Sequence, residues 1–410
     1  MMQRSSVRKS AAWKLIVSGR SVRQLACWHA RPAGSRPRCG AAPAASLLWL
    51  AGVVLFLALG LETTAAAEPK AAPESSQRDA WPVFRGDAAS TGVARSELAE
   101  LPELLWQQTF ADSAFEATAA IVDGRVYAPS LDGNLYALNL ATGEVVWKYF
   151  VELGFKSPAA VRDDLVFVGD VDGRVHAVEI ATGHKRWSFE TNAEINAGAS
   201  FFQDSVLVAS QDGGLYRLKI ADGSQVWKYT IDNMLQCSPS VAGDRCFLAG
   251  CDGKLHIVDL HTGSAVATLD IQDATNVTPA VRGGRVYFGT QGARMFAVDW
   301  REPKVVWTHR TERASPIQSS PAVTESLVIF GSRDRSLHAL TASDGSEAWT
   351  FATRSPIDSS PVVVGERVYF GGGDGRIYGL NLQTGSEEWR YEAGGRFLAS
   401  PAVAQRCLVI

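Results

Sequence analysis

Short runs of alternating apolar and polar residues recur along residues 104–410, and a glycine-containing turn signal bounds each run. Segments such as 320–331 (SPAVTESLVIFG) and 360–371 (SPVVVGERVYFG) have a period of two, which is typical of half-buried strands. Asp-Gly pairs, as at 132–133 and 374–375, favour tight hairpins because both central residues of such turns adopt positive φ. No long stretch has the helical period. The pattern therefore predicts an all-β chain built of hairpins.

A unit of about forty residues repeats along the same region, and a tryptophan marks the end of each unit. LYALNLATGEVVW at 135–147, for example, matches VHAVEIATGHKRW at 175–187 and IYGLNLQTGSEEW at 377–389. Successive tryptophans are 41, 40, 40, 80, 42 and 40 residues apart, and Ala267 stands at the position missing from the interval of 80. These anchor tryptophans are Trp106, Trp147, Trp187, Trp227, Trp307, Trp349 and Trp389.

Each unit supplies four short antiparallel strands, and such a sheet cannot bury both of its faces alone. We therefore expect the units to stack radially into a β-propeller, which leaves only short edges, with each anchor tryptophan packed on the adjacent blade. Seven units end at the anchor positions, and an eighth combines Phe397–Ile410 with the strand around Trp106, so the two chain ends close the ring. The prediction is an eight-bladed β-propeller of four-stranded antiparallel blades.

The eighth blade is the exception, because no third-strand sequence follows Ile410. This blade is expected either to have three strands or to lack about a dozen residues at its carboxyl end when judged against the repeat. The regularity of the other units favours the second interpretation.

An export signal is predicted ahead of the propeller. Leu47–Leu61 is an uncharged apolar run, a basic stretch precedes it, and Ala65-Ala66-Ala67 follows it as a cleavage pattern. Fifteen residues are short for a membrane span, which needs about 20, so a cleaved signal is favoured over an uncleaved anchor. The predicted organisation is a signal peptide at 1–67 with its apolar core at 47–61, a linker and entry segment at 68–103, and the propeller at 104–410.

Charge divides the chain at the same place. The formal net charge is −3, but residues 1–61 hold nine basic side chains and no acidic one. Residues 68–410 hold 31 basic and 42 acidic side chains, a net charge of −11. An acidic surface argues against a nucleic-acid partner, since binding to phosphate needs a concentrated basic footprint. Together with the predicted signal, the charge indicates an exported protein that does not bind nucleic acid.

The repeat SP(A/V)V…VYFG..DG.(L/I)Y.L….TG…W resembles the quinoprotein-type, or PQQ-like, propeller repeat over residues 104–410. Trp81–Asp87 (WPVFRGD) also resembles the entry segment of secreted bacterial propellers of this kind. One branch of the resemblance, the quinoprotein dehydrogenases, implies pyrroloquinoline quinone (PQQ) with calcium and typically a Cys-Cys pair. This sequence has no Cys-Cys pair and no long insertions.

The second branch is the propeller subunit of the outer-membrane-protein assembly machinery (BamB-type), a non-enzymatic scaffold. The near-uniform blades are more similar to this branch, although no lipobox cysteine follows the apolar run. The resemblance thus implies a monomeric protein-interaction scaffold without a cofactor in the bacterial periplasm or cell envelope. Its implied partners are envelope or outer-membrane proteins, and its implied contact with the membrane is indirect at most. The alternatives are a PQQ-dependent oxidoreductase and a carbohydrate- or small-ligand-binding propeller.

A polar residue stands 31 positions before each anchor position, although the following residues form an apolar strand. Because the first strand of a propeller blade is innermost, these residues should surround one mouth of the central channel. They bind a ligand or a partner's loop, or they form a solvated rim. This polar ring consists of Glu116, Lys156, Asn196, Gln236, Asn276, Gln318 and Asp358, with Leu398 at the eighth position.

The remaining candidates are weaker. His176, His256 and His338 occupy a position that is aromatic in other units, which indicates packing, and neither a catalytic nor a metal site is expected. Cys237 and Cys251 either form a disulfide bond or are small buried hydrophobic residues. The units around Ala267 depart from the repeat, with Gly292-Ala293 and Glu302-Pro303 in place of the usual turns. There Trp300 is a candidate exposed aromatic residue on an interaction face.

Overall fold

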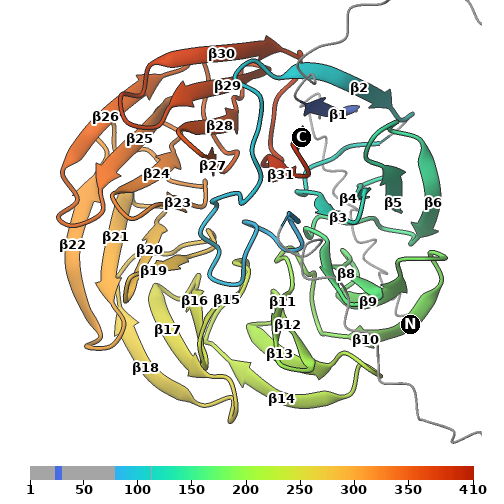
Figure 1. The fold of residues 1–410 in the computed structure, drawn as a ribbon. Coiled ribbons are helices and arrows are strands. Elements are labelled where there is room, and N and C mark those ends of the chain that lie inside the picture. Colours follow the sequence, from blue (N-terminus) through green and yellow to red (C-terminus); the bar gives the residue numbers. More distant parts are fainter. Residues whose placement is uncertain (1–23, 30–78, 112) are drawn as a thin grey trace, which may run out of the picture.

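The structure, a computed structural model, describes residues 24–29, 79–111 and 113–410. Within these residues the chain forms eight four-stranded sheets, arranged around a central channel as an eight-bladed propeller, as predicted (Figure 1). The predicted apolar core at 47–61 lies outside the described residues. In the part of the chain that is described, no helix is long and apolar enough to cross a membrane.

Blades one to seven each contain four consecutive strands that run from the channel to the rim. In blades one to four the strands are β3 (Ala120–Val122), β4 (Arg125–Pro129), β5 (Asn134–Asn139) and β6 (Val145–Phe150); β7 (Ala160–Arg162), β8 (Leu165–Gly169), β9 (Arg174–Glu179) and β10 (Lys185–Glu190); β11 (Ser200–Phe202), β12 (Ser205–Ala209), β13 (Gly214–Lys219) and β14 (Gln225–Thr230); β15 (Ser240–Ala242), β16 (Arg245–Ala249), β17 (Lys254–Asp259) and β18 (Ala265–Asp270). In blades five to seven they are β19 (Ala280–Arg282), β20 (Arg285–Gly289), β21 (Arg294–Asp299) and β22 (Lys304–Arg310); β23 (Ala322–Val323), β24 (Leu327–Gly331), β25 (Ser336–Thr341) and β26 (Glu347–Ala352); β27 (Val362–Val364), β28 (Arg367–Gly371), β29 (Arg376–Asn381) and β30 (Glu387–Glu392).

The anchor tryptophans join neighbouring blades, as the repeat predicts. Each indole Nε1 donates a hydrogen bond of 2.7–3.1 Å to a backbone carbonyl of the next blade or, for Trp389, of the segment before β2. In six joints the indole also covers the glycine of the next blade's Thr-Gly or Asp-Gly turn, whose φ is 69–75°. A Cβ on that glycine would lie 2.6–2.8 Å from the ring. Glycine is therefore required at this position for two reasons: the turn needs a positive φ, and the indole leaves no room for a Cβ.

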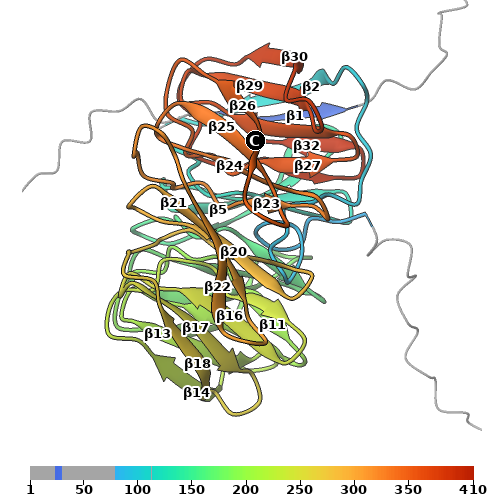
Figure 2. The ribbon, with the colours of Figure 1, turned by 90° about the vertical axis from the view of Figure 1, so that its left-hand side faces the viewer.

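Blade eight combines the two ends of the described chain, but in an unexpected way. It has four strands in the order β31 (Ala402–Ala404), β32 (Cys407–Val409), β1 (Gln24–His29) and β2 (Glu103–Thr109). Figure 2 shows β32, β1 and β2 side by side. The third strand, β1, comes from the basic stretch that the sequence analysis places in the signal peptide. Of the two alternatives, the three-stranded blade is thus wrong for this structure, because QLACWH fills the third-strand position. The favoured alternative, a carboxyl end that lacks about a dozen residues, stays a prediction.

Candidate binding site at the channel mouth

The structure brings the whole polar ring together at one end of the channel. The seven polar side chains and Leu398 line a single cavity of about 190 Å³. Each belongs to the connection that enters the innermost strand of a blade, and each is half-buried. Their neighbours in sequence point into the core, as do Ile195 and Ala197 on either side of Asn196. This alternation follows the period of two and directs one polar side chain per blade toward the channel.

Part of the ring is already paired with neighbouring side chains. Asp358 accepts hydrogen bonds from Arg333, at 2.9 and 3.2 Å, and from Arg396. Lys156 Nζ lies 2.8 Å from Glu194 Oε1, and Gln291 donates a 2.7 Å hydrogen bond to Asn276 Oδ1.

Other members of the ring keep their hydrogen-bonding capacity. Among the described residues, the side chains of Glu116, Gln236 and Gln318 form no hydrogen bond or ion pair. Asn196 Oδ1 is buried and has no partner there either. Since a buried polar atom without a partner costs free energy, these groups favour a bound polar molecule or water at the mouth.

In six of the eight blades a hydroxyl group lies two residues after the polar-ring position, just before the innermost strand. Backbone N–H groups donate to hydroxyl oxygens of the next blade at 2.9–3.2 Å, for example Ser320 N to Ser360 Oγ and Ser360 N to Ser400 Oγ. Within the described chain, these hydroxyls donate no hydrogen bond, so their O–H groups are available to the cavity that they line. The hydroxyl belt consists of Thr118, Ser238, Thr278, Ser320, Ser360 and Ser400.

Residues 79–96 of the entry segment cross the channel, as the blue ribbon in Figure 1 shows. Its backbone carbonyls accept hydrogen bonds of 2.6–3.0 Å from the innermost strands of six blades, from Ile121 in blade one to Val363 in blade seven. Its Phe84 also lines the cavity at the mouth. The channel is therefore a cup with an open mouth and a closed end.

Arg85 of the entry segment lies buried at the closed end, with 1% of its surface exposed. Its Nη2 donates to the carbonyl oxygens of Pro321, at 3.2 Å, and Pro361, at 2.5 Å. Burial lowers the pKa of this guanidinium, against the opposing charge of Asp87. Arg85 thus connects blades six and seven and does not reach solvent.

The histidines at the aromatic position hold turns in place. The Nε2 atoms of His176, His256 and His338 lie 2.8–2.9 Å from carboxylates of Asp170, Asp252 and Asp334. Tyrosines make the same contact in other blades, as Tyr136 does with Asp132 at 2.6 Å. No group of three or more metal-binding side chains occurs in the described ranges.

The pairing of these rings with carboxylates, together with burial, shifts the pKa values of both partners. Burial alone would raise the pKa of Asp170, but hydrogen bonds from His176 and from the Arg174 N–H hold it below its ordinary value. Burial lowers the pKa of His256, against the opposing charge of Asp252. These carboxylate–ring pairs therefore hold the turns of the framework.

Trp300 fills the joint between blades four and five, which differs from the exposed aromatic residue expected there. It is half-buried and packs edge-on against Phe247, with ring centroids 5.4 Å apart. In other blades the residue equivalent to Phe247 contacts that blade's own anchor, as Tyr127 contacts Trp147 at 5.9 Å. Trp300 therefore occupies the volume that Ala267 leaves empty, and no glycine is needed in its turn.

The cysteines of the described residues are free thiols. Cys237, Cys246 and Cys407 are buried, and Cys251 is half-buried. Burial raises the pKa of the Cys237 thiol to about 12. The structure therefore favours the interpretation of Cys237 as a small buried residue over a bond to Cys251.

Two features of the site and its surroundings are absent from the sequence analysis. Most of the hydroxyl belt is visible in the sequence as recurring Ser-Pro pairs, but such a pair by itself indicates only the start of a strand. The strand β1 has one sequence signal, since QLACWH aligns with the third-strand pattern of NLYALN at 134–139. The Asp-Gly turn that precedes five of the other third strands is missing there.

Comparisons with known proteins agree with this architecture. A family model described as "Beta-alanine-activating enzyme, beta-propeller" matches residues 160–410. A second, described as "Outer membrane protein assembly factor BamB", matches residues 99–201. The search of curated proteins found no match.

Solved structures with the same fold come from both branches of the resemblance. BamB from Moraxella catarrhalis is 20% identical over 73% of this chain and 98% of that chain, with a TM-score of 0.62. Quinohemoprotein alcohol dehydrogenase from Comamonas testosteroni is 14% identical over 80% of this chain and 75% of that chain, with a TM-score of 0.67. The computationally designed Ika8 protein is 18% identical over 72% and 96%, with a TM-score of 0.64. At these identities the likeness shows the fold alone.

The repeat, the fold and the family matches together define a β-propeller of PQQ-like repeats. Because the first family model spans more than half of the sequence, the chain belongs to the β-propeller family of the beta-alanine-activating enzyme.

Proposed function

We propose that this chain is a non-enzymatic, exported propeller that binds protein partners of the bacterial cell envelope at the open mouth of its channel. The observation that carries the proposal is the contrast between the unpaired members of the polar ring and the closed opposite end. Glu116, Gln236 and Gln318 form no side-chain hydrogen bond or ion pair within the described residues, and Asn196 Oδ1 is buried without a partner. A partner's loop would supply the missing donors and acceptors.

Exposed apolar side chains on the same face support a protein partner. Phe150 is 62% exposed and Leu153 is 55% exposed, both where blade one continues toward Lys156 at the mouth. Met234, at 41% exposed, occupies the corresponding connection before Gln236. Aromatic and methionine side chains are enriched at the centres of protein interfaces, and polar rims surround them.

The match of residues 99–201 to the family model of the outer membrane protein assembly factor supports envelope partners. The predicted export signal supports the location, and the acidic net charge of −11 for residues 68–410 favours protein over nucleic acid. We propose that a monomeric propeller carries out this function and that any contact with the membrane passes through its partners.

The experiment is a comparison of two variants immobilised on a support and incubated with solubilised envelope proteins. Replacing Asn196, Gln236 and Gln318 together by Ala should reduce the recovery of specific partners about tenfold or more, because the few residues that dominate an interface lie near its centre and each costs about 2 kcal/mol or more when truncated. A matched control replaces the exposed Arg95 and Glu97 of the entry segment. Equal recovery by all variants, measured by quantitative mass spectrometry, would contradict binding at the mouth.

The alternative of a PQQ-dependent oxidoreductase fits the cavity poorly. PQQ carries three carboxylates, and calcium requires six to eight oxygen ligands. Of the described residues that line the cavity, only Lys156 is a cation, and it pairs with Glu194. Asp358 is already paired with Arg333 and Arg396. Quinone absorbance retained after incubation with PQQ and calcium, followed by desalting, would favour this alternative.

A carbohydrate or another small neutral ligand is supported by the hydroxyl belt, whose free O–H groups and nearby amides match a ligand rich in hydroxyl groups. Thermal unfolding in the presence of a panel of sugars separates this function from the scaffold. A rise of Tm with one sugar that disappears in the Gln236→Ala and Gln318→Ala double variant would favour the ligand.

A further inference from the structure

Exposed arginines gather beside the channel mouth at blades six and seven. Two of them lie in the connections that enter these blades, and two lie in the turn between β24 and β25. Both connections end at a member of the polar ring, so the arginines adjoin the cavity at the mouth. This arginine surface consists of Arg313, Arg333, Arg335 and Arg354.

Hydrogen bonds hold the three segments of the arginine surface against one another. Arg313 Nη1 donates to the carbonyl oxygen of Asp334 at 3.3 Å, and the Arg333 N–H donates to a carbonyl of the connection into blade six at 3.1 Å. In the connection into blade seven, the Thr353 N–H donates to the carbonyl oxygen of Arg335 at 2.8 Å. The arginines therefore belong to one continuous surface.

The carboxylates near these arginines leave part of their hydrogen-bonding capacity unused. Arg333 shares the carboxylate of Asp358 with Arg396, so two guanidinium groups pair with one acidic side chain. Within the described residues, the side chains of Arg335 and Arg354 form no hydrogen bond or ion pair. Because a guanidinium group carries five N–H donors, the surface can bind further carboxylates.

One of these arginines stands where most blades have a glycine. The Asp-Gly turns before β5, β9, β13, β17 and β29 place glycine at a φ of 77–93°, whereas blade six has Arg335 there at 74°. Blade five has Ala293 at 66°, whose side chain is only a methyl group. A long side chain at positive φ costs free energy, and such backbone strain is concentrated at functional sites. The turn itself therefore does not require an arginine at this position.

The opposite side of the mouth has the opposite charge. Glu152 and Asp232 are exposed in the connections into blades two and four, and Lys156 pairs with Glu194. In the three segments of the arginine surface, by contrast, Glu312 is the only exposed acidic residue. A nucleic acid or an anionic membrane that covered the mouth would meet like charges on its acidic side. A short acidic segment can contact the arginine surface alone.

We propose that the arginine surface binds an acidic segment of a partner protein, whose side-chain carboxylates pair with the guanidinium groups. Arginine binds carboxylates through two parallel hydrogen bonds, and clusters of arginine are a recurring means of recognising acidic motifs. Gln318 follows Arg313 on the same connection and offers its unpaired amide to the backbone of the segment. The inference rests on the proposed scaffold function and names the chemistry of its partner.

The test uses a short fluorescent peptide of alternating glutamate and serine, and a matched peptide with glutamine in place of glutamate. Fluorescence anisotropy with the purified full chain should show saturable binding of the glutamate peptide. The glutamine peptide should bind about tenfold more weakly or less, because it loses the charge-assisted hydrogen bonds. Raising the salt from about 0.1 M to about 1 M should weaken binding of the glutamate peptide, since the Debye length falls from about 10 Å to about 3 Å.

Two protein variants remove the same number of charges from different parts of the surface. Arg335→Gly with Arg354→Gln should weaken binding of the glutamate peptide about tenfold or more. Glycine relieves the strained turn, so the Tm of this variant should not fall. The matched control replaces Arg95 of the entry segment and Arg301 of the turn between β21 and β22 by Gln. Both arginines are exposed away from the mouth, so the control should bind the peptide as the unmodified chain does.

Equal binding of the two peptides, or equal binding by the two protein variants, would overturn the proposal. Tighter binding to vesicles of anionic lipid or to single-stranded DNA than to the glutamate peptide would also overturn it, and would assign the surface to a membrane or a nucleic acid.

Recovery of envelope partners by the polar-ring variant tests the proposed function separately. Partners that are lost from that variant, in a chain that does not bind the glutamate peptide, would refute only this inference. Partners recovered equally with and without the polar ring, in a chain that binds the peptide through its arginines, would refute only the proposed binding inside the mouth.

Discussion

The two ends of the central channel are built from the same innermost strand, repeated eight times, yet they differ in how their polar groups are used. At the closed end, backbone N–H groups of six blades donate to carbonyls of the entry segment, and Arg85 is buried among them. At the mouth, Glu116, Gln236 and Gln318 have no partner within the described residues. The difference teaches that one added segment is enough to turn a symmetrical ring into a cup with one free face.

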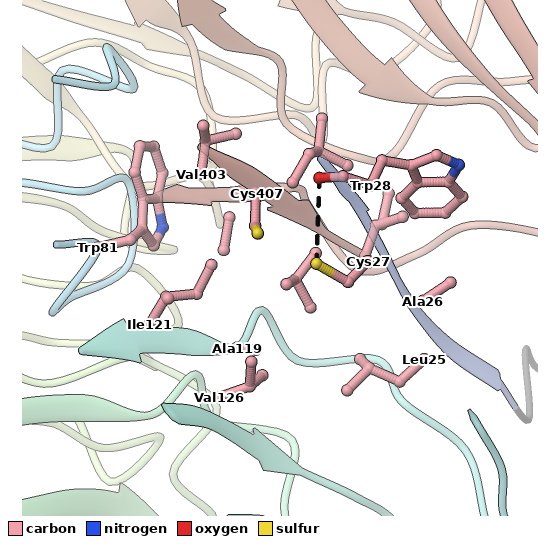
Figure 3. Packing of buried hydrophobic residues seen from close by; sticks show 14 of the residues in the cluster. Leu25, Ala26, Cys27, Trp28, Trp81, Ala119, Ile121, Val126, Val403 and Cys407 are labelled. Carbon is pink, nitrogen blue, oxygen red and sulfur yellow. Dashed lines mark hydrogen bonds between the residues drawn. The ribbon is translucent and has the colours of Figure 1, made fainter. Parts of the chain in front are cut away.

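The largest expected effect concerns the closed end. Trp81 is 1% exposed, its N–H and carbonyl both pair with Ile121, and its ring packs within the cluster shown in Figure 3. Trp81→Ala should lower the free energy of unfolding by about 3–5 kcal/mol, the usual cost of removing a buried large aromatic residue. Chemical denaturation measures the change. A loss below about 1 kcal/mol would show that the entry segment does not hold the ring together.

A smaller effect is expected at the hydroxyl belt, midway between the two ends. Ser360→Ala removes the hydroxyl that accepts the Ser320 N–H at 3.0 Å, which leaves a buried donor without a partner. The free energy of unfolding should fall by about 1–3 kcal/mol. Ser360→Thr is the matched control, because Thr278 fills the same role in blade five. Equal loss in both variants would attribute the effect to packing and not to the hydrogen bond.

The turns near the mouth should contribute a modest dependence on pH. Burial lowers the pKa of His256, so the unfolded chain binds more protons than the folded one near and below the ordinary pKa. Stability should therefore fall as the pH decreases from about 7 to 5. His256→Tyr gives blade four the tyrosine that blade three has at the same position, Tyr216. This variant should remove the contribution of His256 to the dependence of the unfolding free energy on pH. An unchanged slope in urea titrations at several pH values would contradict the account.

The smallest effect on stability is expected for substitutions of unpaired polar residues at the channel mouth. Gln236 and Gln318 contact no partner in the described chain, so replacing both by Ala should change the free energy of unfolding by no more than about 0.5 kcal/mol. Thermal unfolding checks this. A loss of several kcal/mol would mean that the mouth, like the closed end, is part of the structural framework.

Most of the fold and much of the candidate site could be predicted from the repeat in the sequence. Anchor spacing predicted the blades, because a tryptophan that packs on a glycine of the next blade can recur only at one structural position. The same spacing placed the seven members of the polar ring on one mouth. The spacing could not show that a side chain of one blade fills the volume left by a missing anchor in its neighbour. Trp300 does this for Ala267, and the two residues lie in different units of the repeat.

Two further features depended on contacts that no repeat encodes. The entry segment occurs once, so its path across six blades has no pattern to reveal it. Strand β1 lacks both the Asp-Gly turn and the aromatic residue of a regular third strand, and only Leu25, Cys27 and Trp28 fit the pattern. A match of three residues inside an expected export signal is too weak to indicate a blade strand.

The most direct measurement of the central claim is photo-crosslinking in living cells from one position at each end of the channel. A photoreactive residue at Gln236 reports on the mouth, and one at Ala88, exposed on the entry segment, reports on the closed end. The account predicts adducts with envelope proteins from position 236 and none above background from position 88. Adducts from position 88 alone, or equal adducts from both, would contradict a binding function of the open mouth.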